Sequence, residues 1–303
     1  MSSPARDETV VLVQQLRKQR GDRVVLDGVS FAIERGHVFG LIGPNGAGKT
    51  TTIKILLGLL RPDAGTVEVF GKAPMSLPAA DRQRIGFLSE SSLRELPDLP
   101  VTELLEYQSH FFPAWDWSYG EQLVERLAVP RGQRLYAMSE GERRKTELLI
   151  ALAHRPELLI LDDPALGLDA VARREILWAT LAAARDDGTT ILFTSHILQD
   201  VERVVDDVLV LDRGRVRVQG PLEQVLARTK RLVYVDAGDV PPVPGEVSRT
   251  RHGRDLVVVT SEFSSELPHR ATGPAPAVEH LNLEEIFCAF FAGGANGEPG
   301  TTA

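Results

Sequence analysis

The residues best suited to chemistry form a glycine-rich stretch near the N-terminus. Residues 43–50 read Gly-Pro-Asn-Gly-Ala-Gly-Lys-Thr and fit the phosphate-loop pattern G-x-x-x-x-G-K-[ST]. Glycines let the backbone approach a phosphate closely, and consecutive N–H groups form an anion-binding nest. The pattern predicts that Lys49 contacts the β- and γ-phosphates of a nucleotide and that the Thr50 hydroxyl is a Mg²⁺ ligand. The nucleotide-binding residues expected here are Gly43, Pro44, Asn45, Gly46, Ala47, Gly48, Lys49, Thr50 and Thr51.

The segments on either side of this stretch are those that a phosphate loop needs. Residues 38–42 are a short apolar run that predicts a buried strand, and residues 51–60 have the apolar periodicity of a helix. A helix that begins directly after the glycines would add its dipole to the site. A glycine-rich turn that binds nothing is the plain alternative, and the strand–loop–helix order argues against it.

A second group of candidate residues follows another apolar run. Residues 158–161 predict a buried strand that ends in Asp162 and Asp163. In a parallel sheet, ligands bind at the carboxyl ends of the strands. The order therefore predicts that Asp162 holds Mg²⁺, directly or through water, although a solvated strand end would look the same in isolation.

The composition narrows the class of protein. A hydrophobic fraction of 43% and a charged fraction of 25% are those of a globular chain with ample core, and the net charge of −8 argues against a nucleic-acid surface. No apolar run approaches the roughly 18 residues of a membrane span, and residues 1–9 carry no apolar signal region. We therefore expect a cytoplasmic protein with no direct membrane insertion. The single cysteine, Cys288, lies in an apolar helical pattern and is predicted to be buried.

The order of patterns predicts an α/β fold with a mostly parallel core sheet, helices on both faces and an added antiparallel β layer. Alternating runs at residues 10–35 and 66–70 supply that layer, and residues 90–155 read as a helical subdomain. Within the latter, the aromatic segment 112–119 is either core or a surface for a partner. We assign residues 1–228 to a nucleotide-binding domain. Residues 229–303 form a small α+β extension with a final helix from Asn282 and a disordered tail from about 293.

Five further motifs stand in the family's order along the chain and resemble those of ATP-binding subunits of ABC transporters, a family of P-loop NTPases. The similarity covers residues 10 to about 220, and the ending at Asn282 resembles export-type members. The matching positions are Ile85–Glu90 for the Q-loop, Met138–Glu142 for the signature motif, Ala165–Asp169 for the D-loop, Thr194–His196 for the switch histidine, and Arg20 where the family usually has an adenine-stacking aromatic residue.

The resemblance implies a mechanism, cofactors and partners. ATP and Mg²⁺ would bind between two subunits arranged head to tail, in a homodimer or a heterodimer, with Ser139 and Gly141 contacting the ATP held by the other subunit. Asp163, His196 and Glu90 would be the catalytic residues, and Glu90 would also contact the metal. A separate membrane-spanning permease would hold the protein peripherally on the cytoplasmic face of the membrane.

The sequence departs from the family pattern at four positions. Asp163 stands where a catalytic glutamate is usual, which shortens the side chain by about 1.5 Å, and misplacement near 1 Å can reduce a rate about a hundredfold. Glu90 replaces the Q-loop glutamine and cannot donate a hydrogen bond while ionised. Glu140 places an extra carboxylate in the signature motif. Arg20 could stack on a purine or simply be solvated.

These features support a transport ATPase, with export as the favoured direction. Two alternatives stay open at this point. One is a regulatory or sensor subunit that binds ATP and hydrolyses it weakly, and the other is the degenerate half of a heterodimeric pair. DNA-repair and chromosome-structure ATPases with a similar head lack support, because no coiled-coil insertion separates the loop from the signature.

Overall fold

The computed structural model describes residues 8–89, 98–195, 197–238, 240–264 and 275–292. The chain divides into two compact units, Met1–Val216 and Arg217–Ala303. The functional assignment of residues 1–228 as one domain stays a prediction, and the tail from residue 293 lies outside the described residues.

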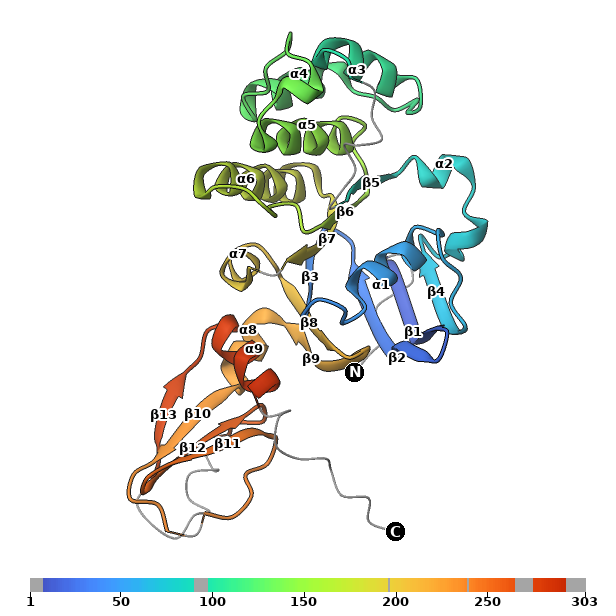
Figure 1. The fold of residues 1–303 in the computed structure, drawn as a ribbon. Helices are drawn as coiled ribbons and strands as arrows, with labels where there is room; N and C mark the ends of the chain where they lie inside the picture. Colours follow the sequence, from blue (N-terminus) through green and yellow to red (C-terminus); the bar gives the residue numbers. More distant parts are fainter. Residues whose placement is uncertain (1–7, 90–97, 196, 239, 265–274, 293–303) are drawn as a thin grey trace. The chain divides into compact units, whose positions relative to one another are not determined.

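Five of the six strands of one sheet lie within the first unit and form its centre (Figure 1). The pairs β5–β6, β6–β7, β7–β3 and β3–β8 are all parallel. Every residue of β3, β6 and β7 is buried, which explains why these strands read as continuous apolar runs rather than alternating ones. In spatial order the strands are β5 (Ile85–Leu88), β6 (Leu158–Asp162), β7 (Thr190–Ser195), β3 (Val38–Ile42), β8 (Asp207–Asp212) and β9 (Arg215–Pro221).

A separate antiparallel sheet has the order β2 (Arg23–Glu34), β1 (Thr9–Arg20), β4 (Ala64–Val69). This sheet confirms the added β layer expected from the alternating runs. Helix α1 (Lys49–Leu56) lies between the two sheets, and its buried Ile53, Ile55 and Leu56 share one apolar core with both of them (Figure 1). The helix that follows the phosphate loop is therefore held on two sides.

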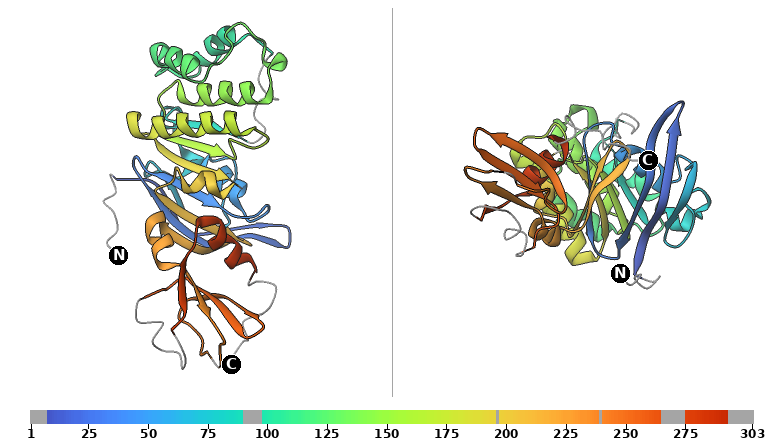
Figure 2. Two further views of the ribbon diagram at one scale, coloured as in Figure 1. Left: turned by 90° about the vertical axis from the view of Figure 1, so that its left-hand side faces the viewer. Right: turned by 90° about the horizontal axis from the view of Figure 1, so that it is seen from below.

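Helices form most of the remainder of this unit. Helix α5 contacts both β5 and α6, and α5 and α6 run side by side in Figures 1 and 2. The predicted helical character of residues 90–155 is confirmed in its described part. The helices are α2 (Ala79–Arg82), α3 (Val101–Ser109), α4 (Trp117–Arg126), α5 (Glu140–Leu152), α6 (Ala170–Asp187) and α7 (Leu198–Glu202), with short 3₁₀ turns at Pro74–Ser76 and Leu135–Ala137.

The aromatic segment 112–119 divides between core and surface. Tyr119 is buried and donates a hydrogen bond from its hydroxyl to Asp187 at 2.7 Å. Phe112 stacks on the buried His154 with ring centroids 4.1 Å apart. Trp117, in contrast, is half exposed. The core role is therefore confirmed for part of this segment, and a surface for a partner stays a prediction for the exposed part.

The described part of the second unit contains a four-stranded antiparallel sheet and two helices. Leu232, Tyr234, Leu256 and Val258 are buried in its core. The sequence signalled only two of these strands, since the edge strands are largely exposed and carry little apolar pattern. The elements are α8 (Leu222–Arg228), β10 (Lys230–Tyr234), β11 (Glu246–His252), β12 (Asp255–Thr260), β13 (Ala277–His280) and α9 (Leu283–Ala292), with sheet order β11-β12-β10-β13.

The predicted burial of Cys288 is wrong, because this side chain is exposed. In α9 the buried residues are Leu283, Ile286 and Ala289, which recur at helical spacing along one face. Cys288 lies off that face. An apolar helix pattern identifies the helix but does not by itself say which of its residues point inward.

His154 gives this fold a measurable pH dependence. Burial lowers the pKa of His154 from 6.5 to about 4 in the folded protein. Between these values the unfolded chain binds more protons, so the free energy of unfolding should fall by up to about 3 kcal/mol as the pH is lowered from 7 to 4. Denaturant unfolding of wild type and His154→Leu at several pH values measures this contribution. The variant should show a flatter pH profile, and identical slopes for both proteins would contradict the assignment.

Candidate nucleotide-binding site

Two glycines allow the phosphate loop to pack against its neighbours. A β-carbon on Gly43 would lie 2.2 Å from the carbonyl oxygen of Leu211 in β8, closer than two such atoms can approach. Gly48 has φ 117°, a left-handed conformation that glycine adopts readily, and a β-carbon there would lie 2.6 Å from the Leu26 side chain. The pattern of glycines thus has a structural cause at both ends of the loop.

The side chain of Lys49 folds over the loop. Its Nζ donates hydrogen bonds to the carbonyl oxygens of Gly43 at 2.6 Å and Pro44 at 3.2 Å. Helix α1 begins at Lys49, and its N-cap residue, Gly48, brings no side-chain acceptor to the helix N-terminus. A cation and a helix N-terminus without a side-chain cap therefore lie together, which is the environment that an anionic phosphate favours.

Asp162 lies at the end of β6 and is nearly fully buried. The hydroxyl of Thr194 in β7 donates to its Oδ1 at 2.8 Å, because the parallel register pairs Asp162 with Thr194. The same hydroxyl accepts the main-chain N–H of Asp163 at 3.0 Å. Thr194 therefore fixes both the carboxylate of Asp162 and the backbone that carries Asp163.

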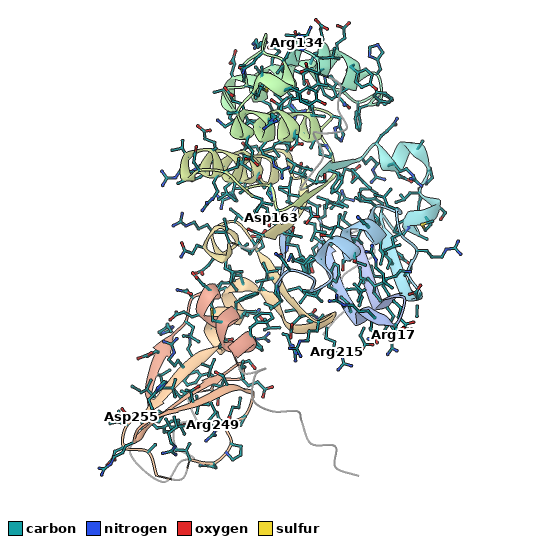
Figure 3. The ribbon with its side chains drawn as sticks, viewed as in Figure 1. Arg17, Arg134, Asp163, Arg215, Arg249 and Asp255 are labelled. Carbon is teal, nitrogen blue, oxygen red and sulfur yellow. The ribbon has the colours of Figure 1, made fainter. Side chains whose placement is uncertain are left out.

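Asp163 has a left-handed backbone, with φ 51° (residue labelled in Figure 3). Among non-glycine residues, asparagine and aspartate tolerate this region best, and the position before Pro164 is restricted further. The carbonyl oxygen of Asp163 accepts the N–H of Leu166 at 3.2 Å, which closes a turn directly after the strand. The shorter side chain at this position therefore matches the local backbone.

A cavity of about 400 Å³ brings most of the predicted residues together. The phosphate loop from Asn45 onward and both strand-end aspartates contribute to its wall, whereas Gly43, Pro44 and Ala47 do not. Cationic and carboxylate groups face the same space, as a site for a metal–polyphosphate complex requires. The lining residues are Arg20, Arg23, Val25, Asn45, Gly46, Gly48, Lys49, Thr50, Thr51, Asp162, Asp163 and Leu166.

Ser139 and Gly141 do not line this cavity. Ser139 is the N-cap of α5 and forms a reciprocal capping box with Glu142: its Oγ accepts the Glu142 N–H at 3.3 Å, and its own N–H donates to the Glu142 carboxylate at 2.8 Å. The Ser139 hydroxyl also donates to Glu142 Oε2 at 2.7 Å, and this bond together with the Ser139 N–H lowers the pKa of Glu142. Glu140 instead lies against the D-loop, with Oε1 2.7 Å from the place that a β-carbon on Gly167 would take. The two carboxylates of the signature motif therefore have different surroundings.

Glu90 and His196, predicted to be catalytic, lie outside the described residues. The backbone immediately before Glu90 is nevertheless held by α5. Arg144 is buried and donates to the carbonyl oxygen of Ser89 at 2.5 Å and to the Glu147 carboxylate at 2.8 Å. The helix that begins at the signature motif is thereby connected to the Q-loop at the residue before Glu90.

Sequence reasoning missed Arg23, Val25 and Leu166 as lining residues and Thr194 as the residue that positions the aspartates. A signal for Arg23 and Val25 was present, because residues two apart on a strand face the same side. Thr194 could have been found only from the register between β6 and β7, which no local pattern reveals.

The strand–loop–helix and its neighbouring aspartates define a P-loop nucleotide-binding protein. Residues 26–166 match the family described as ABC transporter. The Nod factor export ATP-binding protein I of Ralstonia nicotianae is 32% identical over 286 residues, which cover 92% of this chain and 81% of that protein. The daunorubicin resistance ATP-binding protein DrrA3 of Streptomyces coeruleorubidus is 36% identical over 226 residues, which cover 73% of this chain and 71% of that protein.

A solved ATP-binding subunit of an ABC transporter shares the fold, with a TM-score of 0.65 and 29% identity over 72% of this chain and 92% of that one. A post-hydrolysis ATP-binding cassette with bound ADP and phosphate has a TM-score of 0.61 at 20% identity, covering 70% of this chain and 98% of that one. The chain belongs to the ABC transporter family. It is an ATP-binding subunit of that family and an ATPase.

The hydrogen bonds of Thr194 lead to a testable expectation. Thr194→Val removes the hydroxyl that orients Asp162 and Asp163, and loss of such supporting contacts typically reduces activity about 10–100-fold. Thr194→Ser keeps the hydroxyl and should retain most of the turnover. ATP hydrolysis assays on folded protein, checked by thermal melting, measure both variants. Equal turnover in Val and Ser variants would show that the hydroxyl does not position the aspartates.

Proposed function

We propose that this protein is the ATP-hydrolysing motor of an exporter, acting on a separate membrane permease. The observation that carries the proposal is the cavity in which Lys49, Thr50 and Asp162 meet beside the phosphate loop. The names of the two relatives, a Nod factor exporter and a daunorubicin resistance protein, support export as the direction.

In this proposal Lys49 binds the β- and γ-phosphates of ATP, while Thr50 and Asp162 hold Mg²⁺. The hydroxyl of Thr50 and the carboxylate of Asp162 suit this ion, because Mg²⁺ takes oxygen ligands and is usually bound by one or two carboxylates together with substrate phosphates. The bound ion would neutralise developing charge on the phosphate oxygens. The backbone N–H groups of the loop and the N-terminus of α1 orient the polyphosphate chain.

Asp163 acts as the general base that takes the proton of the attacking water. Thr194 and the turn to Leu166 hold its backbone in position. His196 and Glu90 complete the proposed catalytic set, His196 at the γ-phosphate or the water and Glu90 at the metal; their roles are proposed from the sequence alone. Arg20 contacts the nucleotide from the tip of the β1–β2 hairpin.

Proteins of this family dimerise, and we propose that Ser139 and Gly141 bind the ATP held by the other subunit. Their position outside this chain's own cavity supports that role. The capping box leaves the N-terminus of α5 ordered for such a contact. The partner is a second copy or another ATP-binding subunit. The nucleotide-binding domain extends over residues 1–228 in this proposal, with residues 229–303 as an extension.

Family members act with membrane permease components, and we propose the cytoplasmic face of the membrane as the location. Among the described residues, no helix combines the length and apolar character needed to cross a bilayer. Attachment would therefore depend on the permease. The acidic net charge of −8 supports a protein partner over nucleic acid.

Removal of the Lys49 charge tests the nucleotide site directly. Lys49→Ala should weaken Mg·ATP binding at least about tenfold, since charge-assisted hydrogen bonds to phosphate contribute roughly 1.5–3 kcal/mol. Isothermal titration calorimetry measures the affinity, and Lys54→Ala in the same helix is the matched control. Unchanged ATP affinity in Lys49→Ala would refute the site.

Substitution of Asp163 tests the catalytic base. Asp163→Glu should raise ATP turnover about tenfold or more by restoring reach, while it lowers stability by about 1 kcal/mol because glutamate tolerates the left-handed backbone less well. Asp163→Asn keeps the backbone preference without the carboxylate and should abolish turnover with ATP binding intact.

Steady-state ATPase assays measure the turnover of the wild type and of the two Asp163 variants. His196→Ala, assayed with them, should also lose activity. Turnover in Asp163→Asn equal to wild type would exclude Asp163 as the base. Near-zero wild-type turnover with tight ATP binding would favour a regulatory subunit over a motor.

A further inference from the structure

Two arginines at the tip of the β1–β2 hairpin face the nucleotide cavity. Arg20 is the last residue of β1 and Arg23 the first of β2, and the antiparallel register places them directly opposite each other. Side chains of directly opposed residues lie on the same face of a sheet. Both arginines line the cavity, and the two-residue turn Gly21–Asp22 fixes their spacing.

The ionic surroundings of this pair differ from those of nearby cations. Arg17 and Arg215, both labelled in Figure 3, pair with Asp27, and Lys18 pairs with Asp63 at 2.7 Å. Within the described part of the chain, Arg20 and Arg23 have no carboxylate partner, and the exposed Asp22 between them forms no ion pair with either. Opposed like charges destabilise a hairpin. An anionic ligand would relieve that repulsion.

Arg23 lies close to the phosphate loop. Its Nη2 is 3.6 Å from the place that a β-carbon on Gly46 would take, so its guanidinium is in contact range of the loop. Lys49 approaches the same loop from the carbonyls of Gly43 and Pro44. A polyphosphate in the cavity would therefore meet cations from two different elements, the hairpin and α1.

At this end of the cavity the side chains of Arg20 and Arg23 offer a ligand hydrogen-bond donors and no acceptors. Arginine presents five N–H donors and no acceptor, and Val25 beside it adds only apolar surface. An adenine amino group would find no side-chain acceptor among these three residues, whereas phosphate oxygens accept from guanidinium in a bidentate manner. A guanidinium plane can stack on any purine, so Arg20 offers no strong choice between bases.

We propose that Arg23, supported by Arg20, is a polyphosphate-binding residue of this site. The inference rests on the proposed function. Its consequence is that Arg23 contributes to the binding of ATP, GTP and inorganic tripolyphosphate alike, because these ligands share the phosphate chain.

The test compares ATP, GTP and inorganic tripolyphosphate, each with Mg²⁺, by calorimetry on the full chain. Arg23→Gln should weaken all three ligands by a similar factor of about ten, because it removes a contact to phosphate that they share. Arg17→Gln makes the same change of charge in the neighbouring strand β1, at an ion-paired residue outside the cavity. It should leave all three affinities unchanged.

Three outcomes would overturn the inference. They are unchanged ATP affinity in Arg23→Gln, loss of ATP affinity in that variant without loss of tripolyphosphate affinity, or no competition between tripolyphosphate and ATP. If Lys49→Ala weakens ATP binding while Arg23→Gln does not, only this inference fails. If Lys49→Ala also has no effect, the proposed nucleotide site fails first.

Discussion

Parallel pairing of β6 with β7, and of β7 with β3, is the constraint on which the site depends. All three strands end at the same edge of the sheet, so the phosphate loop, Asp162 and Thr194 meet there although they are far apart in sequence. The register is strict because all three strands are fully buried. A shift of one residue would move Thr194 away from Asp162 and would separate the loop from its carboxylates.

Close packing makes the loop equally constrained. The loop passes so near β8 that Gly43 has no room for a side chain, and Gly48 must adopt a left-handed backbone to start α1. Helix α1 is in turn packed between two sheets in one apolar core. The position of Lys49 is thus determined by buried contacts of its neighbours, which is how a rigid scaffold orients a half-buried charge for ligand binding.

The departures from the family pattern look different in their structural setting. Asp163 replaces a longer carboxylate, yet its left-handed backbone is one that aspartate tolerates. Glu142 serves as the capping-box partner of Ser139, while Glu140 lies against Gly167 of the D-loop. Arg20 is one of two opposed arginines rather than a single replaced aromatic residue. Each of these four residues therefore fits a feature of the local structure.

Sequence alone determined the phosphate loop, the parallel core and the family, because glycine spacing, buried apolar runs and motif order are local properties of the chain. It also gave the capping box at Ser139, whose two members are three residues apart. It failed for Cys288, and it missed Thr194 and Arg23. Those roles depend on which face of a helix is buried and on register between strands distant in sequence. Only tertiary packing decides these, because the hydrogen bonds and side-chain contacts that set them join segments that no local pattern connects.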